Sequence, residues 1–360
     1  MGFIQLSPWR SCAISLTLLS FLILPSCTSV AYFQQAALGQ LSLLVERESI
    51  EELLADEALD DNLRESFQVV LDIRHFAETE LNLSVDASYT SYVALEHDYV
   101  AWNVFAAEEF SVDAITWCFP IAGCIAYRGY FDESKAQDYA QSLQDDSLEV
   151  YVGGVSAYST LGWFNDPVLS SMLRSSDTQL AATLIHEIAH RTVYASGDST
   201  FNESFATFVE REGVRRWLAY QGLSDRMEEF DEAHKRRSDF SGLILAARDR
   251  LRRVYQGGDE DKSRTEKEVI KNLLRADYAK LKESWGGFTG YDKWFDGPLN
   301  NAQLSTVATY NELSSEFACL FDHHREDLAA FLDEIRVLAA HKGLASAQLS
   351  RRVQELHCVV

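Results

Sequence analysis

The stretch DTQLAATLIHEIAHRTVYA, residues 177–195, constrains the fold of this chain more than any other. Its apolar residues recur three and four positions apart, which predicts an α-helix with a buried apolar face, and Asp177 stands in the position of an N-cap. His186 and His190 are four residues apart. At about 3.6 residues per turn, this spacing brings both imidazoles to one side of the helix. We therefore expect a fold whose core encloses this helix.

The two histidines have the spacing of metal ligands. Side chains at positions i and i+4 lie about 5 to 6 Å apart at Cβ, so both imidazoles can reach one tetrahedral ion such as Zn²⁺. Glu187 sits about a quarter turn from His186, outside the ligand set but beside a metal-bound water, where a general base acts. The alternative is a buried helix with satisfied histidines. We favour the metal site, because the helix is otherwise apolar and the glutamate occupies the required position.

A catalytic zinc held by two histidines needs a third ligand and an open position. Two glutamates on the next predicted helix are candidates: Glu203, with 12 residues between it and His190, and Glu210, with 19. They are seven residues apart and therefore share a helix face. Glu203 also has a structural interpretation, because Thr200 and Glu203 form a capping-box pattern. Spacing alone leaves the choice open, and counting would favour Glu210.

Other residues near the motif are candidates for supporting roles. Tyr158 or Tyr194 could donate a hydrogen bond to a developing oxyanion, although simple packing explains either tyrosine as well. Asp198 either orients a ligand histidine or forms a turn with Gly197, and we favour the turn. The stretch GGVSAYSTLGWF, residues 153–164, is a candidate edge strand to which a peptide could add.

The N-terminus has the pattern of an export signal. An apolar run from about residue 13 to 24 is too short to span a bilayer comfortably, and the sequence Leu-Pro-Ser-Cys follows it, ending at Cys27. This ending resembles a bacterial lipobox; an ordinary signal peptide is the alternative. We expect residues 1–26 to be a lipoprotein signal peptide and acyl chains on Cys27 to hold the protein on a lipid bilayer. By resemblance to the known sorting rule, Thr28 favours the periplasmic face of the outer membrane in a bacterial cell envelope.

Export permits disulfide bonds. Cys118 and Cys124 flank a Pro and a Gly in WCFPIAGC, and we predict a local disulfide between them. Zinc ligation by this pair is the weaker option, since no second pair has metal spacing. Cys319 and Cys358 could pair or stay free.

The pattern along the chain predicts one α+β domain, mostly helical, over residues 27–360. Two amphipathic helices are expected between residues 32 and 83, and a small β-sheet between 92 and 155 that packs on the His-Glu-x-x-His helix. A charged stretch from 224 to 285 reads as a long helical hairpin insertion, which we interpret as solvated and without chemistry.

The charge of the chain excludes one class of partner. With 32 basic and 55 acidic residues the formal net charge is −23. Such a chain repels polynucleotides, so we expect no nucleic-acid partner.

Several motifs together resemble a bacterial family of predicted, lipoprotein-like zinc aminopeptidases. They are the lipobox, YFQQAALGQLSLL, WCFPIAGCIAYRGYF, AYSTLGWFNDP, the His-Glu-x-x-His motif, FNESFATFVE and WFDGPLNNAQL. In FNESFATFVE, Asn202 and Glu203 match the Asn-Glu-x-Phe-Ala signature of thermolysin-like zinc aminopeptidases, so the resemblance implies Glu203 as the third zinc ligand. The spacer after His190 is shorter than the roughly 18 to 19 residues usual there. The Gly-x-Met-Glu-Asn strand that binds a free amine in such enzymes is absent.

These observations predict a zinc-dependent peptidase. His186, His190 and Glu203 would hold Zn²⁺, Glu187 would act as general base, and the substrate would be a peptide. The resemblance implies an aminopeptidase. The alternatives are an endopeptidase of the same zinc class and a non-catalytic envelope lipoprotein with a structural zinc.

Overall fold

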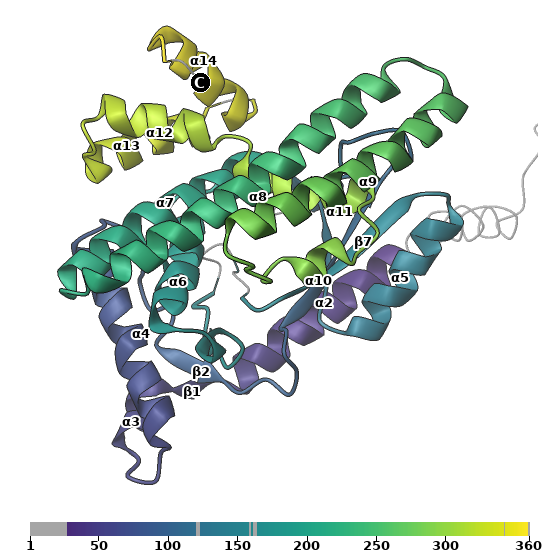
Figure 1. Ribbon diagram of the computed structural model, residues 1–360. Coiled ribbons are helices and arrows are strands. Elements are labelled where there is room, and N and C mark those ends of the chain that lie inside the picture. Colours follow the sequence, from purple (N-terminus) through teal and green to yellow (C-terminus); the bar gives the residue numbers. More distant parts are fainter. Residues whose placement is uncertain (1–26, 120–122, 158–159, 161–163, 342, 359–360) are drawn as a thin grey trace, which may run out of the picture. The chain divides into compact units, whose positions relative to one another are not determined.

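The computed structural model describes residues 27–119, 123–157, 160, 164–341 and 343–358 (Figure 1). The chain divides into two compact units, residues 1–46 and 47–360. The described part of the first unit is the helix α2 (Cys27–Val45), and the predicted signal peptide, residues 1–26, lies outside the described residues. Within the described part of the chain, no helix combines the length and the hydropathy that crossing a bilayer requires.

The second unit is mostly helical with small sheets, which confirms the predicted fold class. Its helices are α3 (Ile50–Ala55), α4 (Asp61–Thr79), α5 (Glu133–Asp145), α6 (Asp177–Thr192), α7 (Ser199–Tyr220), α8 (Asp225–Tyr255), α9 (Glu260–Ser284), α10 (Asp292–Phe295), α11 (Asn301–Asn311), α12 (Ser314–His323), α13 (Leu328–Ala339) and α14 (Ala345–Glu355), with a 3₁₀ turn η1 (Met172–Arg174). Its strands are β1 (Glu48–Ser49), β2 (Ser91–Val93), β3 (Ala101–Ala107), β4 (Trp117–Phe119), β5 (Gly123–Ile125), β6 (Arg128–Tyr130), β7 (Glu149–Val155) and β8 (Val168–Leu169).

The strands form small separate sheets rather than one. The longest strands pair antiparallel in the order β6-β3-β7, so β7 lies at an edge of this sheet. The order of a second sheet is β1-β2-β8, with β2 and β8 parallel. Strands β4 and β5 form a hairpin, and α5 and α11 pack on β3 and β7. Of the candidate substrate strand, residues 153–164, the part up to Val155 belongs to β7, and residues 158–159 and 161–163 lie outside the described residues.

One of the two helices predicted between residues 32 and 83 is interrupted. The stretch QLSLLVERESIEELL was expected to be one amphipathic helix, but α2 ends at Val45 and α3 begins at Ile50. Between them Glu48 and Ser49 pair with β2, and the Ser49 hydroxyl accepts a hydrogen bond from Glu52 N as the N-cap of α3. Strand pairing thus ends the helix where the apolar pattern continues.

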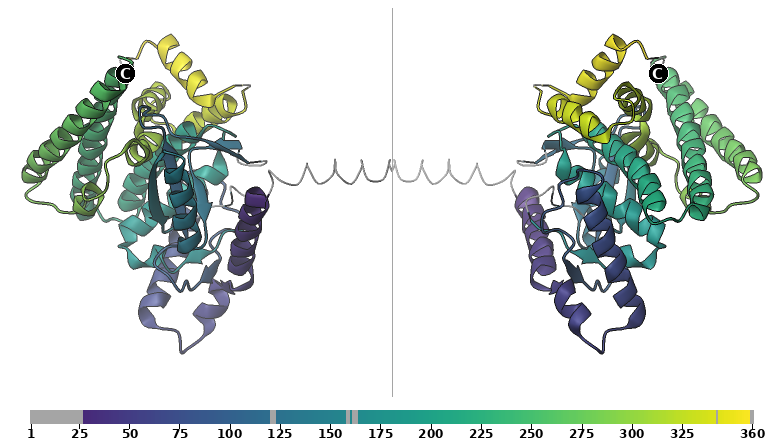
Figure 2. Two further views of the ribbon diagram at one scale, coloured as in Figure 1. Left: turned by 90° about the vertical axis from the view of Figure 1, so that its right-hand side faces the viewer. Right: turned by 90° about the vertical axis from the view of Figure 1, so that its left-hand side faces the viewer.

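The predicted hairpin is formed by α8 and α9, two long helices that lie side by side (Figures 1 and 2). Its interpretation as a solvated insertion is wrong. Phe240, Ile244 and Leu251 of α8 and Leu274 of α9 are buried in an apolar cluster. The hairpin is therefore part of the core of the second unit.

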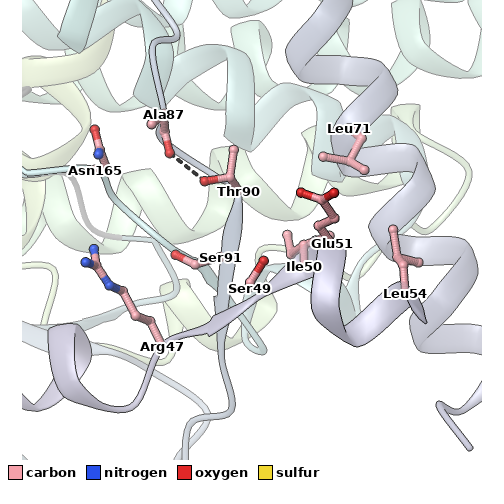
Figure 3. Close-up of a pocket in the computed structure, with 10 residues that line it drawn as sticks. All are labelled: Arg47, Ser49, Ile50, Glu51, Leu54, Leu71, Ala87, Thr90, Ser91 and Asn165. Atoms are coloured by element: carbon pink, nitrogen blue, oxygen red, sulfur yellow. Dashed lines mark hydrogen bonds between the residues drawn. The ribbon is translucent and has the colours of Figure 1, made fainter. Parts of the chain in front are cut away.

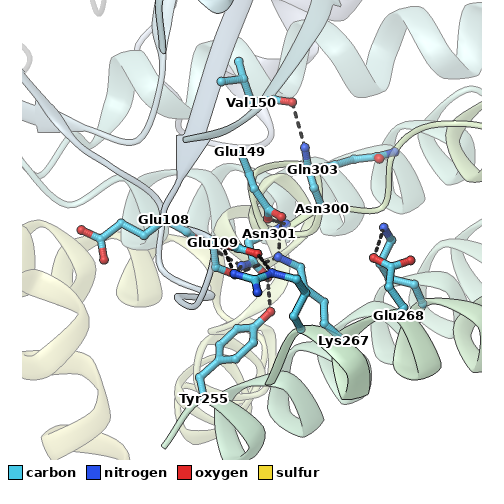
Figure 4. A network of polar contacts seen from close by, with 12 residues as sticks. Glu108, Glu109, Glu149, Val150, Tyr255, Lys267, Glu268, Asn300, Asn301 and Gln303 are labelled. Carbon is cyan, nitrogen blue, oxygen red and sulfur yellow. Dashed lines mark hydrogen bonds and ion pairs between the residues drawn. The ribbon is translucent and has the colours of Figure 1, made fainter. Parts of the chain in front are cut away.

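A polar network also ties α9 to the sheet (Figure 4). Lys267, whose side chain is only 5% exposed, pairs with Glu149 at the start of β7. It also donates to the carbonyl of Glu109 at 2.8 Å, and Asn301 N donates to Glu149 Oε2 at 2.7 Å. Each buried charge in this network therefore meets an opposite charge or a hydrogen-bond partner.

Two disulfides are present in the second unit. Cys118 and Cys124 join β4 to β5, and Cys319 of α12 is joined to Cys358, which follows α14. The second pair settles the choice that the sequence left open for Cys319 and Cys358.

Candidate metal centre

The helix α6 carries both histidines and is fixed by its apolar side. Its residues Leu180, Leu184 and Ile188 are at most 3% exposed. The predicted N-cap was wrong by one position: the Ser176 hydroxyl accepts from Gln179 N, and Asp177 is the first helical residue. A carboxylate in the first turn still stabilises the helix through its dipole.

The helix α7 carries both candidate glutamates, and its cap also differs from the prediction. Asp198, not Thr200, is the N-cap: its Oδ1 accepts from Phe201 N at 3.1 Å. Its Oδ2 accepts from the backbone and the hydroxyl of Ser346, at the start of α14. The capping-box interpretation of Glu203 is therefore wrong. The carboxylate of Glu203 lies near the two histidines instead of capping the helix. Asp198 is a cap and a tether rather than a histidine partner.

Asn202 holds the connection between the two helices. Its Oδ1 accepts from Ala195 N and its Nδ2 donates to Ala195 O, both at 2.8 Å, and the residue is 1% exposed. This double hydrogen bond folds the connector back onto the first turn of α7. A buried asparagine before the glutamate thus has a structural reason in this chain.

The structure brings His186, His190 and Glu203 together. The two Nε2 atoms are 3.2 Å apart, and each lies 3.4 Å from Glu203 Oε2. An ion with tetrahedral bonds of about 2.0 to 2.1 Å separates neighbouring ligand atoms by about 3.3 to 3.4 Å. The three atoms therefore already have the spacing of three corners of such a tetrahedron, and the donor set fits zinc.

Glu210 occupies the opposite side of His186. Its Oε2 lies 3.2 Å from His186 Nδ1, and its Oε1 accepts from Arg237 of α8 at 2.7 Å. A carboxylate on the second nitrogen of a ligand histidine fixes its tautomer and orientation. Of the two candidate glutamates, Glu203 faces the Nε2 atoms of both histidines, and Glu210 contacts the other ring nitrogen of His186, Nδ1.

The electrostatics of the cluster favour a positive charge between these groups. Burial lowers the pKa of His186, but Glu203 and Glu210 outweigh it and raise this pKa to about 10. Burial likewise raises the pKa of Glu203, yet the two histidines bring it well below its usual range. Carboxylates that hold a proton on an imidazole this strongly would also stabilise a metal cation.

Glu187 lies on α6 between the two histidines, and the charges of His186, His190 and Glu203 all act on its carboxyl. It keeps some access to solvent, but desolvation of its carboxyl raises its pKa.

Tyr89 was missed by the sequence analysis. It is 2% exposed, and its φ of 61° lies in the left-handed region that tyrosine rarely adopts. Its N–H donates to the carbonyl of Asp166 at 2.6 Å, and Asp166 N donates to the Ser88 hydroxyl at 3.2 Å. These two hydrogen bonds hold the unusual backbone beside Glu187. No signal in the sequence marks the position.

Of the two candidate oxyanion donors, Tyr158 lies outside the described residues. Tyr194 lies in the connector after α6. Burial, with a contribution from the charge of Glu203, raises the pKa of Tyr194 to about 12. Its phenol is therefore a hydrogen-bond donor near the cluster at neutral pH.

Two cavities of the second unit lie away from the three ligand atoms. One of about 590 Å³ lies beside β1, α3 and α4 and is lined by Arg47, Glu51 and Asn165 among others (Figure 3). None of its lining residues belongs to the cluster, so we assign it no role in the chemistry. A second cavity, of about 380 Å³, reaches Glu210 and Arg237 behind His186.

The fold and the site together define a mostly helical α+β protein with a candidate metal centre between two consecutive helices. The chain belongs to the protein family described as "Putative aminopeptidase", whose model matches residues 31–349. No curated protein and no solved structure gives a significant match. Membership of this family indicates peptide hydrolysis and a peptide substrate at a coarse level, and it confirms the resemblance to aminopeptidases.

Proposed function

We propose that this protein is a zinc-dependent aminopeptidase whose metal is held by His186, His190 and Glu203. The observation that carries the proposal is the spacing of the three ligand atoms, 3.2, 3.4 and 3.4 Å. Two of them belong to α6, which also carries Glu187, and the third belongs to α7. The family supports the peptide substrate.

The residues of the chain have distinct roles in this mechanism. Bound zinc supplies a Lewis acid that lowers the pKa of water toward about 7 and polarises a carbonyl. Glu187 takes the proton of the water that attacks the peptide carbonyl and delivers it to the leaving amine. Glu210 keeps His186 oriented through Nδ1 while its own charge is balanced by Arg237.

A structural zinc is the less favoured alternative. Such a site is closed by four protein ligands, whereas a catalytic site keeps an open position. Among the described residues, the cluster that could hold a metal has three members, and Glu210 is engaged with the other nitrogen of His186. This arrangement supports a catalytic site.

Attachment to a membrane is a separate part of the proposal. The lipobox-like ending at Cys27 supports acylation there and a place on the periplasmic face of the outer membrane. Incorporation of labelled palmitate into the full chain, compared with Cys27→Ser, tests it. Equal labelling of both proteins would contradict it.

The enzymatic proposal is tested on protein that starts after Cys27. We would measure zinc by elemental analysis and hydrolysis of peptides with free or acetylated N-termini, for the wild type and Glu187→Gln. We expect zinc in both proteins and cleavage of free peptides by the wild type alone. Equal cleavage of acetylated peptides would indicate an endopeptidase instead, and zinc without any cleavage would favour a structural role.

A further inference from the structure

The disulfide-closed hairpin β4-β5 lies directly against the connector between α6 and α7. A Cβ placed on Gly123 would lie 2.6 Å from Gly197 N and 2.8 Å from the Ser196 hydroxyl oxygen. Gly123 has a φ of 76°, in the left-handed region. Because the obstacle includes backbone atoms, no side chain fits at Gly123 without separating the hairpin from the connector.

The other side of this hairpin is anchored in the β6-β3-β7 region. Trp117 Nε1 donates to the Tyr139 hydroxyl of α5 at 2.9 Å, and α5 packs on β3 and β7. Cys118 and Cys124 are cross-strand neighbours joined by their disulfide. The hairpin, whose two strands are joined by the disulfide, therefore contacts α5 on one side and the α6–α7 connector on the other.

The connector determines where two of the proposed ligands meet. It leaves α6 just after His190 and enters α7 just before Glu203, whose ligand atoms are 3.4 Å apart. Asn202 in the first turn of α7 and Asp198, the N-cap of α7, fix the connector on this side. The hairpin fixes it from outside, at Gly197.

We propose that the β4-β5 hairpin is a clamp on the α6–α7 connector that keeps His190 and Glu203 in metal-binding positions. The proposal rests on the proposed function, because it concerns the retention of that metal. Gly123 is then a positioning residue, and the Cys118–Cys124 disulfide keeps the two strands from separating.

The test follows zinc loss from the loaded protein to excess chelator. Cys118→Ser/Cys124→Ser is compared with Cys319→Ser/Cys358→Ser, which removes the disulfide of the C-terminal helices. We expect zinc loss about tenfold faster for the first variant, as for other groups that support metal ligands. The second variant should change the rate much less, because the C-terminal helices reach the connector through the contact of Ser346 with Asp198, which does not involve their disulfide. Equal rates for the first variant and the wild type, or equal acceleration in both variants, would overturn the clamp.

A second pair of variants keeps the disulfide. Gly123→Ala and Gly197→Ala both place a side chain at a left-handed φ, but a Cβ on Gly197 comes no closer than 3.7 Å to its neighbours. We expect Gly123→Ala to lose zinc faster than Gly197→Ala. Equal rates or the opposite order would contradict the clamp, because the close contact at Gly123 would then add nothing to the backbone strain that both variants share.

If Cys118→Ser/Cys124→Ser does not fold, the hairpin disulfide can instead be broken in a protein that has already folded. In Cys319→Ser/Cys358→Ser, the Cys118–Cys124 bond can be reduced by a phosphine, and zinc loss measured before and after. Acceleration supports the clamp, and an unchanged rate overturns it. If the wild type holds no zinc, the proposed function fails together with the clamp; if it holds zinc that the hairpin variants retain equally, the clamp fails by itself.

Discussion

The metal cluster and the Lys267 network both hold carboxylates largely out of solvent, one between α6 and α7 and the other between α9 and β7, but they balance the charge in different ways. Glu149 pairs with Lys267, so this network contains its own cation (Figure 4). Glu203 instead faces the Nε2 atoms of His186 and His190, which can bind a metal ion in place of a proton. The charge of Glu149 is therefore balanced by a cation of the protein, and no further ion is needed. The carboxylate of Glu203 and the two Nε2 atoms are instead groups that can all bind one metal ion.

The largest effect that tests this comparison is the loss of zinc itself. Removing a ligand with His190→Ala or Glu203→Ala should reduce zinc from about one equivalent to a trace, because a tetrahedral site cannot keep the ion with two protein ligands. Lys267→Met should keep the full equivalent. Elemental analysis after gel filtration measures both, and full zinc in Glu203→Ala would break the distinction between the two clusters.

The Lys267 network should show its effect in stability. Lys267→Met leaves Glu149, whose side chain is 20% exposed, without its cation. Breaking a fully buried pair costs about 3 to 5 kcal/mol in the free energy of unfolding, so we expect a smaller loss of about 1 to 3 kcal/mol here. Urea unfolding with and without zinc measures it. Adding Glu149→Gln should restore part of the loss. A Lys267→Met protein of wild-type stability would show that the network is dispensable.

Support for a ligand should have a smaller effect than removal of a ligand. Glu210→Gln keeps the shape of the side chain but weakens its interaction with His186 Nδ1 at 3.2 Å. Loss of such a partner typically weakens metal binding by about 10 to 100-fold. Competition with a chelator measures the affinity. Complete loss of zinc in Glu210→Gln would make Glu210 a ligand and revive the alternative with four protein ligands.

The sequence predicted what depends on local periodicity. The helix expected over residues 177–195 and the hairpin of α8 and α9 follow from apolar spacing and a glycine-containing break. Both are present, although α6 ends at Thr192, three residues earlier than expected. The caps were harder to predict because neighbouring residues compete for each cap. Asp198 also receives two hydrogen bonds from Ser346, which no local pattern around Thr200 could reveal.

The partners of the cluster depend on tertiary contacts and were therefore only partly predictable. Glu203 and Glu210 were both identified by their shared helix face. Their different positions around His186 follow from the packing of α7 on α6. Arg237 is one of 32 basic residues, on a hairpin that the charge pattern suggested was solvated, so nothing in the sequence marked it.

Arg237 provides the smallest and most specific prediction. Its side chain is 41% exposed, so its ion pair with Glu210 is partly screened by solvent. Pairs of this kind contribute about 0.2 to 1 kcal/mol, so Arg237→Met should weaken zinc binding at most about fivefold. Arg236→Met is the matched control, because Arg236 pairs with the exposed Glu232 and should leave the affinity unchanged. If Arg237 acts through Glu210, it should have no further effect in a Glu210→Gln background. A full additional fivefold loss there would mean that Arg237 acts on the cluster directly, and the metal cluster would then resemble the Lys267 network in depending on a cation of its own.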